Sequence, residues 1–569
     1  DCSYLYIFLR YGLLFMLIAI TVYVLCSKKY RDDPYFVAVI VLISVNCMIA
    51  HHIIELTYNP FALALFAAMP EYEKRDNRSN ISKWSRVNFI MNMILTASTF
   101  IFPLITLPYI TRVLAVEGVG KVNIATSIAQ YFSMVAMLGV PTYGIRACAQ
   151  VRDDREKLTR TVQEILLLNL LISIFVYIAY FIAVWQVPKM HNDAVLYWIM
   201  SSTIIFNVIG VEWLYKGLEQ YTYITVRSII FKAIGLVLMF LFVRHQGDYV
   251  IYGAISIVAT VGSNFLNFIN LRKYIDLRPV GHYDLKRHLK EVMIFFAMAA
   301  ATTIYTNLDN VMLGFLKNET QAGYYGTAIK VKALLVSFVT ALSTVLLPRV
   351  SYYIERGMKE EFRKVSRKAL HFVVMIALPV TVYFIFYARE SIFLLASNTY
   401  ESSIVPMQII MPTVLLIGLT NVLGIQIMVP IGKEKMVFYS VLAGGIADFI
   451  ANMIFIPSMA AAGAALGTLI AETVVLIVQL IVLRGWIRDL FSEIQWGKLC
   501  IATALAMFGS WWIKAMHLSN FIALVLSVCA FMLIYATVLW MLRESLFIDI
   551  CQDVLHGKVK FGKAKNNGE

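Results

Sequence analysis

The sequence is poor in charged residues. Only 15% of its 569 residues are Asp, Glu, Lys or Arg, whereas 60% are hydrophobic, and the mean hydropathy is +0.73. A chain of this composition cannot cover itself with a surface that water solvates, which excludes a soluble globular protein. The composition is typical of an integral membrane protein.

The seven cysteines lack a functional spacing, and the common enzyme motifs are missing. No CxxC or Cys/His pattern occurs, and most of the cysteines lie in apolar segments. The stretch EGVGKV lacks the first glycine and the Ser/Thr of a nucleotide-binding loop, and neither GxSxG nor a DxD-like sugar-nucleotide signal is found. The sequence therefore predicts no catalytic residue, no cofactor and no metal site.

Long apolar segments fill most of the chain. We count about sixteen that reach or approach the roughly 20 residues needed to cross a bilayer as a helix. Stretches such as AVLYWIMSSTIIFNVIG do not alternate in the way that β-barrel strands do. The expected fold class is an all-α polytopic membrane protein.

The basic residues that give the chain its net charge of +14 are concentrated in alternate loops. If Asn88–Tyr109 is taken as a first crossing, loops rich in Lys and Arg alternate with loops that are poor in them, such as PKMHND and KNETQ. This alternation is the positive-inside rule, and it assigns the basic loops and the basic C-terminal tail to the cytoplasm. The excess charge thus reports topology, and no nucleic-acid partner is expected.

A weak internal repeat connects two halves of the main body. The stretch 111–129 aligns with the stretch 309–331, so that Gly120 matches Gly323 and Ala125 matches Ala328. Repeats of this kind in transporters usually enclose a substrate site at their interface.

Several longer stretches resemble a known family. They are FPLITLPYITRVLAVEGVGKVNIA, GVEWLYKGLEQYTYIT, YTNLDNVMLGFLKNETQAGYYGTAIKV and AAAGAALGTLIAETVVL. These are similar to the oligosaccharide flippases of bacterial O-antigen and capsule synthesis, which share a superfamily with the multidrug and toxin extrusion transporters. The first 70 residues, with DCSYLYIFLRYGLLF and HHIIELTYNPFALALFA, resemble instead the C-terminal end of a polysaccharide polymerase.

The resemblance implies two pseudo-symmetric six-helix bundles followed by two C-terminal helices and preceded by two or three extra transmembrane helices. The expected order is a polymerase-like fragment (1–70), a cytoplasmic linker (71–87), the first bundle (88–275), a cytoplasmic loop (276–290), the second bundle (291–486), two extra helices (487–545) and a basic cytoplasmic tail (546–569).

Two cations in one predicted helix are candidates for binding an anionic cargo. A charged side chain near the bilayer centre is costly, so it needs a partner, a wet cavity or a ligand. Lys232 is expected near the midplane, and Arg227 nearer the cytoplasmic surface. The alternative is a structural ion pair with a buried acid such as Glu212 or Glu472.

A second cationic segment, GTAIKVKALL, holds Lys330 and Lys332. Positions two apart on a helix differ by about 200°, so only one of the two lysines can point inward. A pair between Lys330 and Asp309 on the preceding helix is the structural alternative. Arg112 resembles the motif arginine at the periplasmic end of the family's first helix, although it could equally anchor that helix at the headgroup boundary.

Acids in the second half are candidates for ion coupling. Asp448 and Glu472 lie within apolar segments, each with an amide residue on the same helix face. Superfamily relatives suggest proton or sodium binding at such positions, whereas simple pairing with a buried cation is the alternative. Asp309 and Glu212 are further candidates for the coupling ion.

The functional hypothesis is a flippase that moves a polyprenyl-pyrophosphate-linked oligosaccharide from the cytoplasmic to the periplasmic face of the bacterial inner membrane by alternating access. Its expected partners are that lipid and the membrane lipids, with polymerase and chain-length machinery as further candidates. An extrusion-type cation antiporter is the alternative, together with part of a polymerase for the leading fragment. The excess of basic over acidic cavity candidates favours an anionic cargo.

Overall fold

The computed structural model describes residues 79–516 and 518–555. The chain divides into two units, Asp1–Val87 and Asn88–Glu569, and the fold described here is that of the second unit. The leading segment 1–70, and with it the resemblance to a polymerase, lies outside the described residues.

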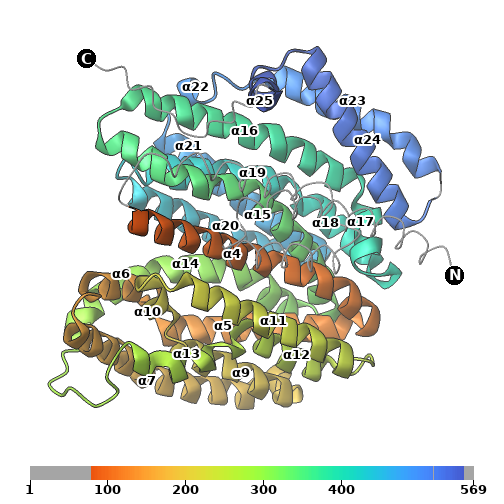
Figure 1. Cartoon of the computed structure of the whole chain (residues 1–569). Coiled ribbons are helices and arrows are strands. Elements are labelled where there is room, and N and C mark those ends of the chain that lie inside the picture. Colours follow the sequence, from red (N-terminus) through yellow and green to blue (C-terminus); the bar gives the residue numbers. More distant parts are fainter. Residues whose placement is uncertain (1–78, 517, 556–569) are drawn as a thin grey trace, which may run out of the picture. The chain divides into compact units, whose positions relative to one another are not determined.

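Helices make up both halves of the second unit (Figure 1). The first half contains α4 (Ser79–Val113), α5 (Val116–Met137), α6 (Val140–Val151), α7 (Arg155–Gln186), α8 (Pro188–Asn192), α9 (Ala194–Ile209), α10 (Glu212–Gly217), α11 (Tyr221–Phe242), α12 (Tyr249–Ile257), a π-helical segment (Val258–Gly262), α13 (Asn264–Asn270) and a short 3-10 turn (Leu271–Lys273).

The second half begins with two long helices. It contains α14 (Lys286–Leu316), α15 (Glu319–Glu355), α16 (Lys359–Phe386), α17 (Ala388–Leu395), a 3-10 segment (Asn398–Ser403), α18 (Ile404–Ile410), α19 (Pro412–Asn421), a π-helical segment (Val422–Met428), α20 (Glu434–Met459), α21 (Ala461–Val482), α22 (Ile487–Leu490), α23 (Trp496–Ala515), α24 (Asn520–Met541) and α25 (Ser545–Leu555).

Ten helices in the described part of the chain are long and apolar enough to cross a membrane. An eleventh span is formed if Asn398–Ile410 and Pro412–Met428, which are bent by 42° relative to each other, are taken together. The structure therefore confirms an all-α polytopic membrane protein.

Local sequence explains where the helices start and where they touch. The Asp154 carboxylate accepts hydrogen bonds from the Glu156 and Lys157 amides, both at 3.1 Å, and so caps α7. The turn between α20 and α21 is tight, and a side chain at Gly463 would lie 2.4 Å from the Phe455 carbonyl oxygen. Glycine at this position lets the two helices pack backbone to backbone.

The loop between the two halves is held on the side of α7. The Gln163 side chain donates to the carbonyl oxygens of Asp276 and Arg278, both at 2.8 Å, and accepts from the Tyr283 hydroxyl at 2.8 Å. Next to it, the Glu164 carboxylate accepts from the Asp284 amide at 3.0 Å. These bonds fix the start of α14 against the first half.

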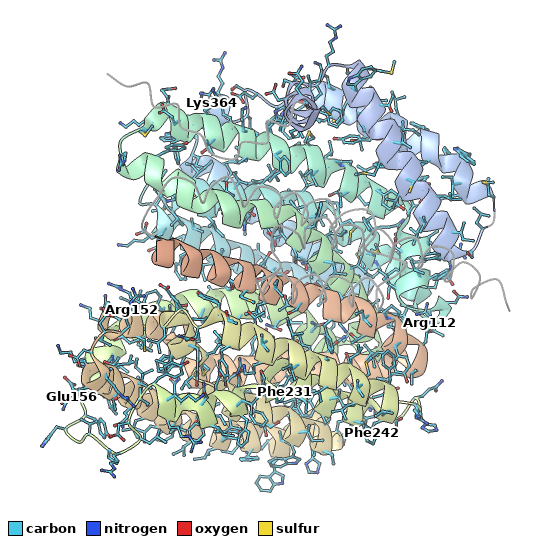
Figure 2. The ribbon with its side chains drawn as sticks, in the orientation of Figure 1. Arg112, Arg152, Glu156, Phe231, Phe242 and Lys364 are labelled. Atoms are coloured by element: carbon cyan, nitrogen blue, oxygen red, sulfur yellow. The ribbon has the colours of Figure 1, made fainter. Side chains whose placement is uncertain are left out.

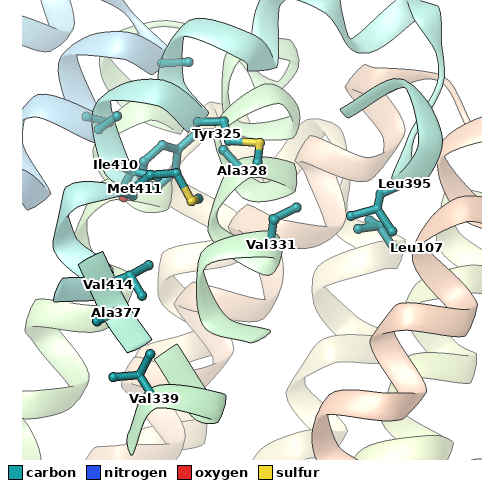
Figure 3. Close-up of a cluster of buried hydrophobic side chains, with 14 of the residues drawn as sticks. Leu107, Tyr325, Ala328, Val331, Val339, Ala377, Leu395, Ile410, Met411 and Val414 are labelled. Carbon is teal, nitrogen blue, oxygen red and sulfur yellow. The ribbon is translucent and has the colours of Figure 1, made fainter. Parts of the chain in front are cut away.

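Apolar side chains from both halves form the main core (Figure 3). Leu107 of α4 lies beside Leu395 of α17, and the Thr111 hydroxyl donates to the Leu395 carbonyl oxygen at 3.4 Å. Ala328 and Val331 on α15 are also fully buried in this core. Helix α15 therefore has a rigid apolar environment around the polar positions discussed below.

The two C-terminal helices are joined to the second half by hydroxyl groups. The hydroxyls of Tyr383 and Ser527 lie 2.7 Å apart, and the Tyr387 hydroxyl donates to the Ser510 carbonyl oxygen at 2.7 Å. The Tyr535 hydroxyl donates to the carbonyl oxygen of Met375, also at 2.7 Å. Because these bonds lie in an apolar environment, α23 and α24 are expected to move with α16 and α17 as one body.

A buried acid fixes the start of α25. Glu544 is fully buried, its Oε1 lies 2.8 Å from His371 Nε2, and its Oε2 accepts from the Phe547 amide at 2.7 Å. Burial opposes ionisation of this carboxyl, but the His371 ring and the Phe547 and Leu546 amides hold its pKa below the ordinary value of 4.5.

We expect Glu544→Gln to lower the apparent melting temperature, because it weakens buried hydrogen bonds worth about 1–3 kcal/mol together. A group with a depressed pKa contributes stability that is present at higher pH and lost as the pH falls through that pKa. The difference between wild type and variant, measured by thermal unfolding in detergent, should therefore persist at neutral pH and shrink below about pH 4.5. Glu493→Gln, which removes a half-exposed partner of Arg367, serves as the control and should change the midpoint little.

Candidate functional site

The helical unit has two ends, which Figure 2 shows from the side. Figure 2 shows Arg152, Glu156 and Lys364 toward one end, and Arg112 and Phe242 toward the other. We call the first the basic end, because the helices that begin there carry a set of cations: Arg155, Lys157, Arg160, Lys286, Arg287, Lys290, Lys359, Arg363, Arg367 and Lys435. The opposite end, where α5, α15 and α21 begin, is called the distal end.

The two halves meet along α5 and α15, and the matched glycines of the repeat touch each other there. A side chain at Gly120 would lie 1.7 Å from the Glu319 carbonyl oxygen and 2.9 Å from the Gly323 nitrogen, and one at Gly323 would lie 2.3 Å from the Val116 carbonyl oxygen. An ion pair between Lys189 and Glu319 (2.7 Å) adds to this contact. The seam between α5 and α15, the α5–α15 seam, is therefore closed at the distal end.

The two lysines of α15 have different surroundings. Lys330 lies two turns from Gly323, so it is on the helix face that meets α5. Among the described residues it has neither a hydrogen bond nor an ion pair, so the alternative of a pair with Asp309 is not what the structure contains. Lys332 lies two turns from Tyr325, on the face that points into the second half, and interacts electrostatically with Glu472, Asp309 and Asp448.

Asp309 is the centre of a buried hydrogen-bond cluster in the second half. Its Oδ1 accepts from Asn452 Nδ2 at 2.6 Å. Its Oδ2 accepts from the hydroxyls of Tyr325 and of Thr468, the latter at 2.9 Å, and these two hydroxyls lie 2.8 Å apart. One carboxylate thus joins α14, α15, α20 and α21, and the partners that donate these hydrogen bonds are neutral.

One turn nearer the basic end, the same helices carry a second polar layer that is not satisfied. Tyr305, Asp448 and Glu472 are each four residues from a member of the Asp309 cluster. Both carboxylate oxygens of Asp448 and the Tyr305 hydroxyl are buried and form no well-aligned hydrogen bond among the described residues, although Asp448 lies beside Asp309 and Tyr305 lies beside Glu472. An unpaired buried carboxylate is costly, so this layer is a place for a proton or a cation.

Gly467 leaves room between the Asp309 cluster and the second polar layer. A side chain at Gly467 would lie 2.2 Å from Asn452 Oδ1 and 3.2 Å from Asp448 Oδ1. Asn452 Oδ1 is itself buried without a partner. The groups here present carboxylate and amide oxygens, which suit a proton or a weakly bound monovalent cation better than a transition metal.

Arg227 is engaged in structural contacts. Its guanidinium is buried, donates to the Ser263 carbonyl oxygen at 2.9 Å and to Asn264 Oδ1 at 3.2 Å, and pairs with Glu212 at 3.6 Å. Glu212 also pairs with Lys216 at 2.8 Å. Arg227 and Glu212 therefore hold α10, α11 and α13 together.

Lys232 and Arg112 have other environments. The half-buried Lys232 ammonium donates to the Ser98 hydroxyl at 2.8 Å, so it faces α4 and forms no ion pair with either acid that the sequence suggested. Arg112 is exposed at the distal end of α4, where it donates to the carbonyl oxygens of Pro108 and Leu394 at 2.6 and 2.8 Å. The bond to Leu394 ties the end of α4 to α17, whereas the bond to Pro108 lies within α4.

The uncharged residues of the Asp309 cluster cannot be found by searching the sequence for charged side chains in apolar segments. Tyr325 and Thr468 lie in apolar segments, and only the partners that other helices bring to Asp309 identify them. Asn123, on the face of α5 that meets α15, was not a candidate either, because a lone asparagine in an apolar run is no signal in sequence. The periodicity of Asn452 with Asp448 was the one visible clue to the cluster.

The close contact of Gly120 and Gly323 can be tested with an added methyl group. We expect Gly120→Ala to push α5 and α15 apart at the distal end, because the methyl group would overlap the Glu319 carbonyl oxygen. In a variant without native cysteines, labelling of Val116→Cys by a membrane-impermeant maleimide should then rise several-fold. Gly262→Ala is the matched control, since its nearest neighbour would be 3.4 Å away. Unchanged labelling in the Gly120 variant would contradict a seam sealed by these glycines.

Comparison with known sequences gives a consistent set of relatives. Residues 85–354 match the family model described as polysaccharide biosynthesis protein. A protein of Escherichia coli (strain K12), provisionally described as an O-antigen transporter, is 23% identical over 409 residues, which are 71% of this chain and 98% of that protein. A protein of Shigella dysenteriae with the same description is 21% identical over 401 residues, 69% of this chain and 98% of that protein.

Solved structures share the fold. The lipid II flippase MurJ in an inward closed conformation matches with a TM-score of 0.65 at 15% identity, over 81% of this chain and 99% of that one. An inward-facing multidrug resistance transporter of the MATE family and MOP superfamily matches with a TM-score of 0.52 at 13% identity, over 68% of this chain and 98% of that one. The chain is thus a multi-pass bacterial membrane protein related to the polysaccharide biosynthesis proteins and O-antigen transporters, and it is a transporter rather than an enzyme.

Proposed function

We propose that the protein flips polyprenyl-pyrophosphate-linked oligosaccharides from the cytoplasmic to the periplasmic face of the inner membrane, for the synthesis of a surface polysaccharide such as O-antigen or capsule. The names of its relatives and a fold shared with a lipid flippase support a lipid-linked saccharide as cargo. The positive-inside rule supports a cytoplasmic location for the basic end and the C-terminus.

The observation that carries the proposal is the unpaired Lys330 on the face of α15 that meets α5. Lys330 is half-buried, and no acidic side chain pairs with it among the described residues, so its ammonium is available to an anionic ligand. A pyrophosphate loses its hydration when it leaves the headgroup layer, and an ammonium in a low-dielectric site replaces part of that hydration. Lys232 is a second candidate, whereas Arg227 is held in structural contacts with Glu212, Ser263 and Asn264.

Transport requires the α5–α15 seam to open. With Gly120 and Gly323 in contact, cargo bound at Lys330 cannot leave at the distal end. Rocking of the halves, with the distal contact broken, would expose the same lysine to the periplasm, which is alternating access between two states of a fixed site.

The unsatisfied layer around Asp448 is proposed as the coupling site. A proton or a sodium ion at Asp448 would remove the cost of an unpaired buried carboxylate, with Glu472 beside it and Lys332 as a built-in counterion when the site is empty. Asp309 is proposed to hold the four helices in register around this layer, because its own oxygens are already bonded.

We expect Lys330→Ala to slow translocation by roughly 10- to 100-fold, the equivalent of losing one charge-assisted hydrogen bond to phosphate. Lys330→Arg should retain most of the activity. The measurement uses proteoliposomes with a labelled polyprenyl-pyrophosphate oligosaccharide and an impermeant sugar-modifying reagent outside. Lys317→Ala, on the exposed loop before α15, controls for net charge. If the Lys330→Ala variant translocates the lipid as fast as the wild type at equal protein content, this lysine is not part of the cargo site.

If the wild type moves no saccharide lipid but takes up organic cations, the protein is instead an extrusion-type transporter.

Coupling is tested by the ratio of translocation rates with and without an inward ion gradient. For the wild type we expect a ratio well above one for either a proton or a sodium gradient, and the effective gradient identifies the ion. Asp448→Asn cannot release a proton and binds sodium poorly, so its ratio should fall to about one. Glu390→Gln, which changes a buried acid paired with Lys514 outside the cluster, should keep the wild-type ratio. An unchanged ratio in Asp448→Asn would refute coupling at this residue.

A further inference from the structure

Three helices meet just inside the distal contact. Helix α14 packs on α5 where a side chain at Gly314 would lie 2.8 Å from Ile124 Cδ1. Nearer the basic end, the Tyr131 hydroxyl of α5 donates to the Ile304 carbonyl oxygen of α14 at 3.2 Å. Helix α15 lies on the adjacent face of α5, where a side chain at Gly326 would come within 2.2 Å of Asn123 Nδ2. The α5–α15 seam is thus bordered by α14.

Two amide groups at this junction are left without partners. Asn123 Nδ2, a hydrogen-bond donor, is buried and unbonded among the described residues, and so is Asn310 Oδ1, an acceptor. Asn310 lies one turn from Gly314, on the face of α14 that meets α5. Buried amide groups are normally bonded, so an unpaired donor and an unpaired acceptor on neighbouring faces need an explanation.

The cation of the seam lies close to the same place. Lys330 is one turn beyond Gly326 on α15, and Gly326 is the residue against which Asn123 packs. The junction therefore combines one positive charge, one free donor and one free acceptor, contributed by three helices from both halves. An amide pair of this kind matches ring hydroxyls or an acetamido group, and the ammonium matches a phosphate.

We propose that Asn123 and Asn310 form a subsite for the sugar residue that is attached directly to the pyrophosphate, while Lys330 holds the phosphate. This inference rests on the proposed flippase function and adds recognition of the sugar to it. Both amides are specificity residues: they contact the first sugar, whichever residues follow it in the repeat.

The closed seam gives this subsite a role in the transport cycle. In the state described here the two amide groups are buried and unbonded, and a sugar can reach them only when α5 separates from α14 and α15. Cargo that satisfies both groups binds the separated state better than the closed one and so shifts the population toward it. A bare lipid pyrophosphate would lack this differential interaction and should open the seam less.

The test compares two probes on the full chain in nanodiscs: polyprenyl pyrophosphate, and the same lipid carrying a single N-acetylhexosamine. We expect the wild type to bind the sugar-bearing lipid roughly tenfold more tightly, as for one or two additional hydrogen bonds. Asn123→Ala and Asn310→Ala should bring the two affinities together while leaving the affinity for the bare lipid near that of the wild type. Lys330→Ala should weaken both.

Matched variants make the outcome decisive. Asn169→Ala removes another buried amide with an unpaired oxygen, located between α7 and α5 near Met137, and should keep the tenfold preference. Asn123→Ser and Asn310→Ser serve if an alanine variant fails to fold, and retained binding of the bare lipid reports folding in each case. If wild type binds neither lipid, the proposed function fails. If it binds both and the asparagine variants keep the preference for the sugar, the subsite is wrong and the flippase proposal stands.

Discussion

The carboxylate of Asp309 is the interaction on which the second half depends. In a membrane no water is available to satisfy a buried acid, so its hydrogen bonds have to come from other helices of the same chain. Asn452, Tyr325 and Thr468 provide them, and each comes from a different helix. Removing the acid would take away the acceptor shared by all three donors and leave the Tyr325 and Thr468 hydroxyls with the hydrogen bond between them, and removing one donor would leave part of a carboxylate unpaired. The position of every group around it, including Asp448 and Lys332, follows from this arrangement.

The two halves use a shared helix arrangement in different ways. In the register that matches Gly120 with Gly323, Lys330 aligns with Ser127, and Asp309 aligns with Thr106. The first half thus has neutral side chains where the second half has charges. A carrier that binds an anionic cargo and uses a cation as its driving ion needs separate sites for the two. A basic and an acidic side chain in one place would pair with each other and bind neither ion. Here Lys330, the lysine proposed to bind the cargo, lies on one face of α15, and the acids lie behind the opposite face.

The structure gives a physical reason for the matched glycines of the weak internal repeat. Two residues alike among many apolar ones are poor evidence of repetition, but the structure brings Gly120 and Gly323 to the same point, where a methyl group on either would overlap backbone atoms. At this contact the backbones of α5 and α15 approach closely, and the Lys189–Glu319 ion pair adds to it. In the proposed transport cycle, this is the contact that has to open.

The sequence by itself determined the membrane class, the helical nature of the spans, the alternating charge of the loops and the helix positions that carry buried charges. These features depend on local composition and on the 3.6-residue period, both of which are visible along the chain. It also showed that Lys330 and Lys332 face apart. Only the tertiary structure decided that Lys332 faces the acids, that Arg227 pairs with Glu212, and that Asp309 is hydrogen-bonded to neutral groups. The partner of a buried charge comes from another helix, and which helices become neighbours depends on packing across the whole unit.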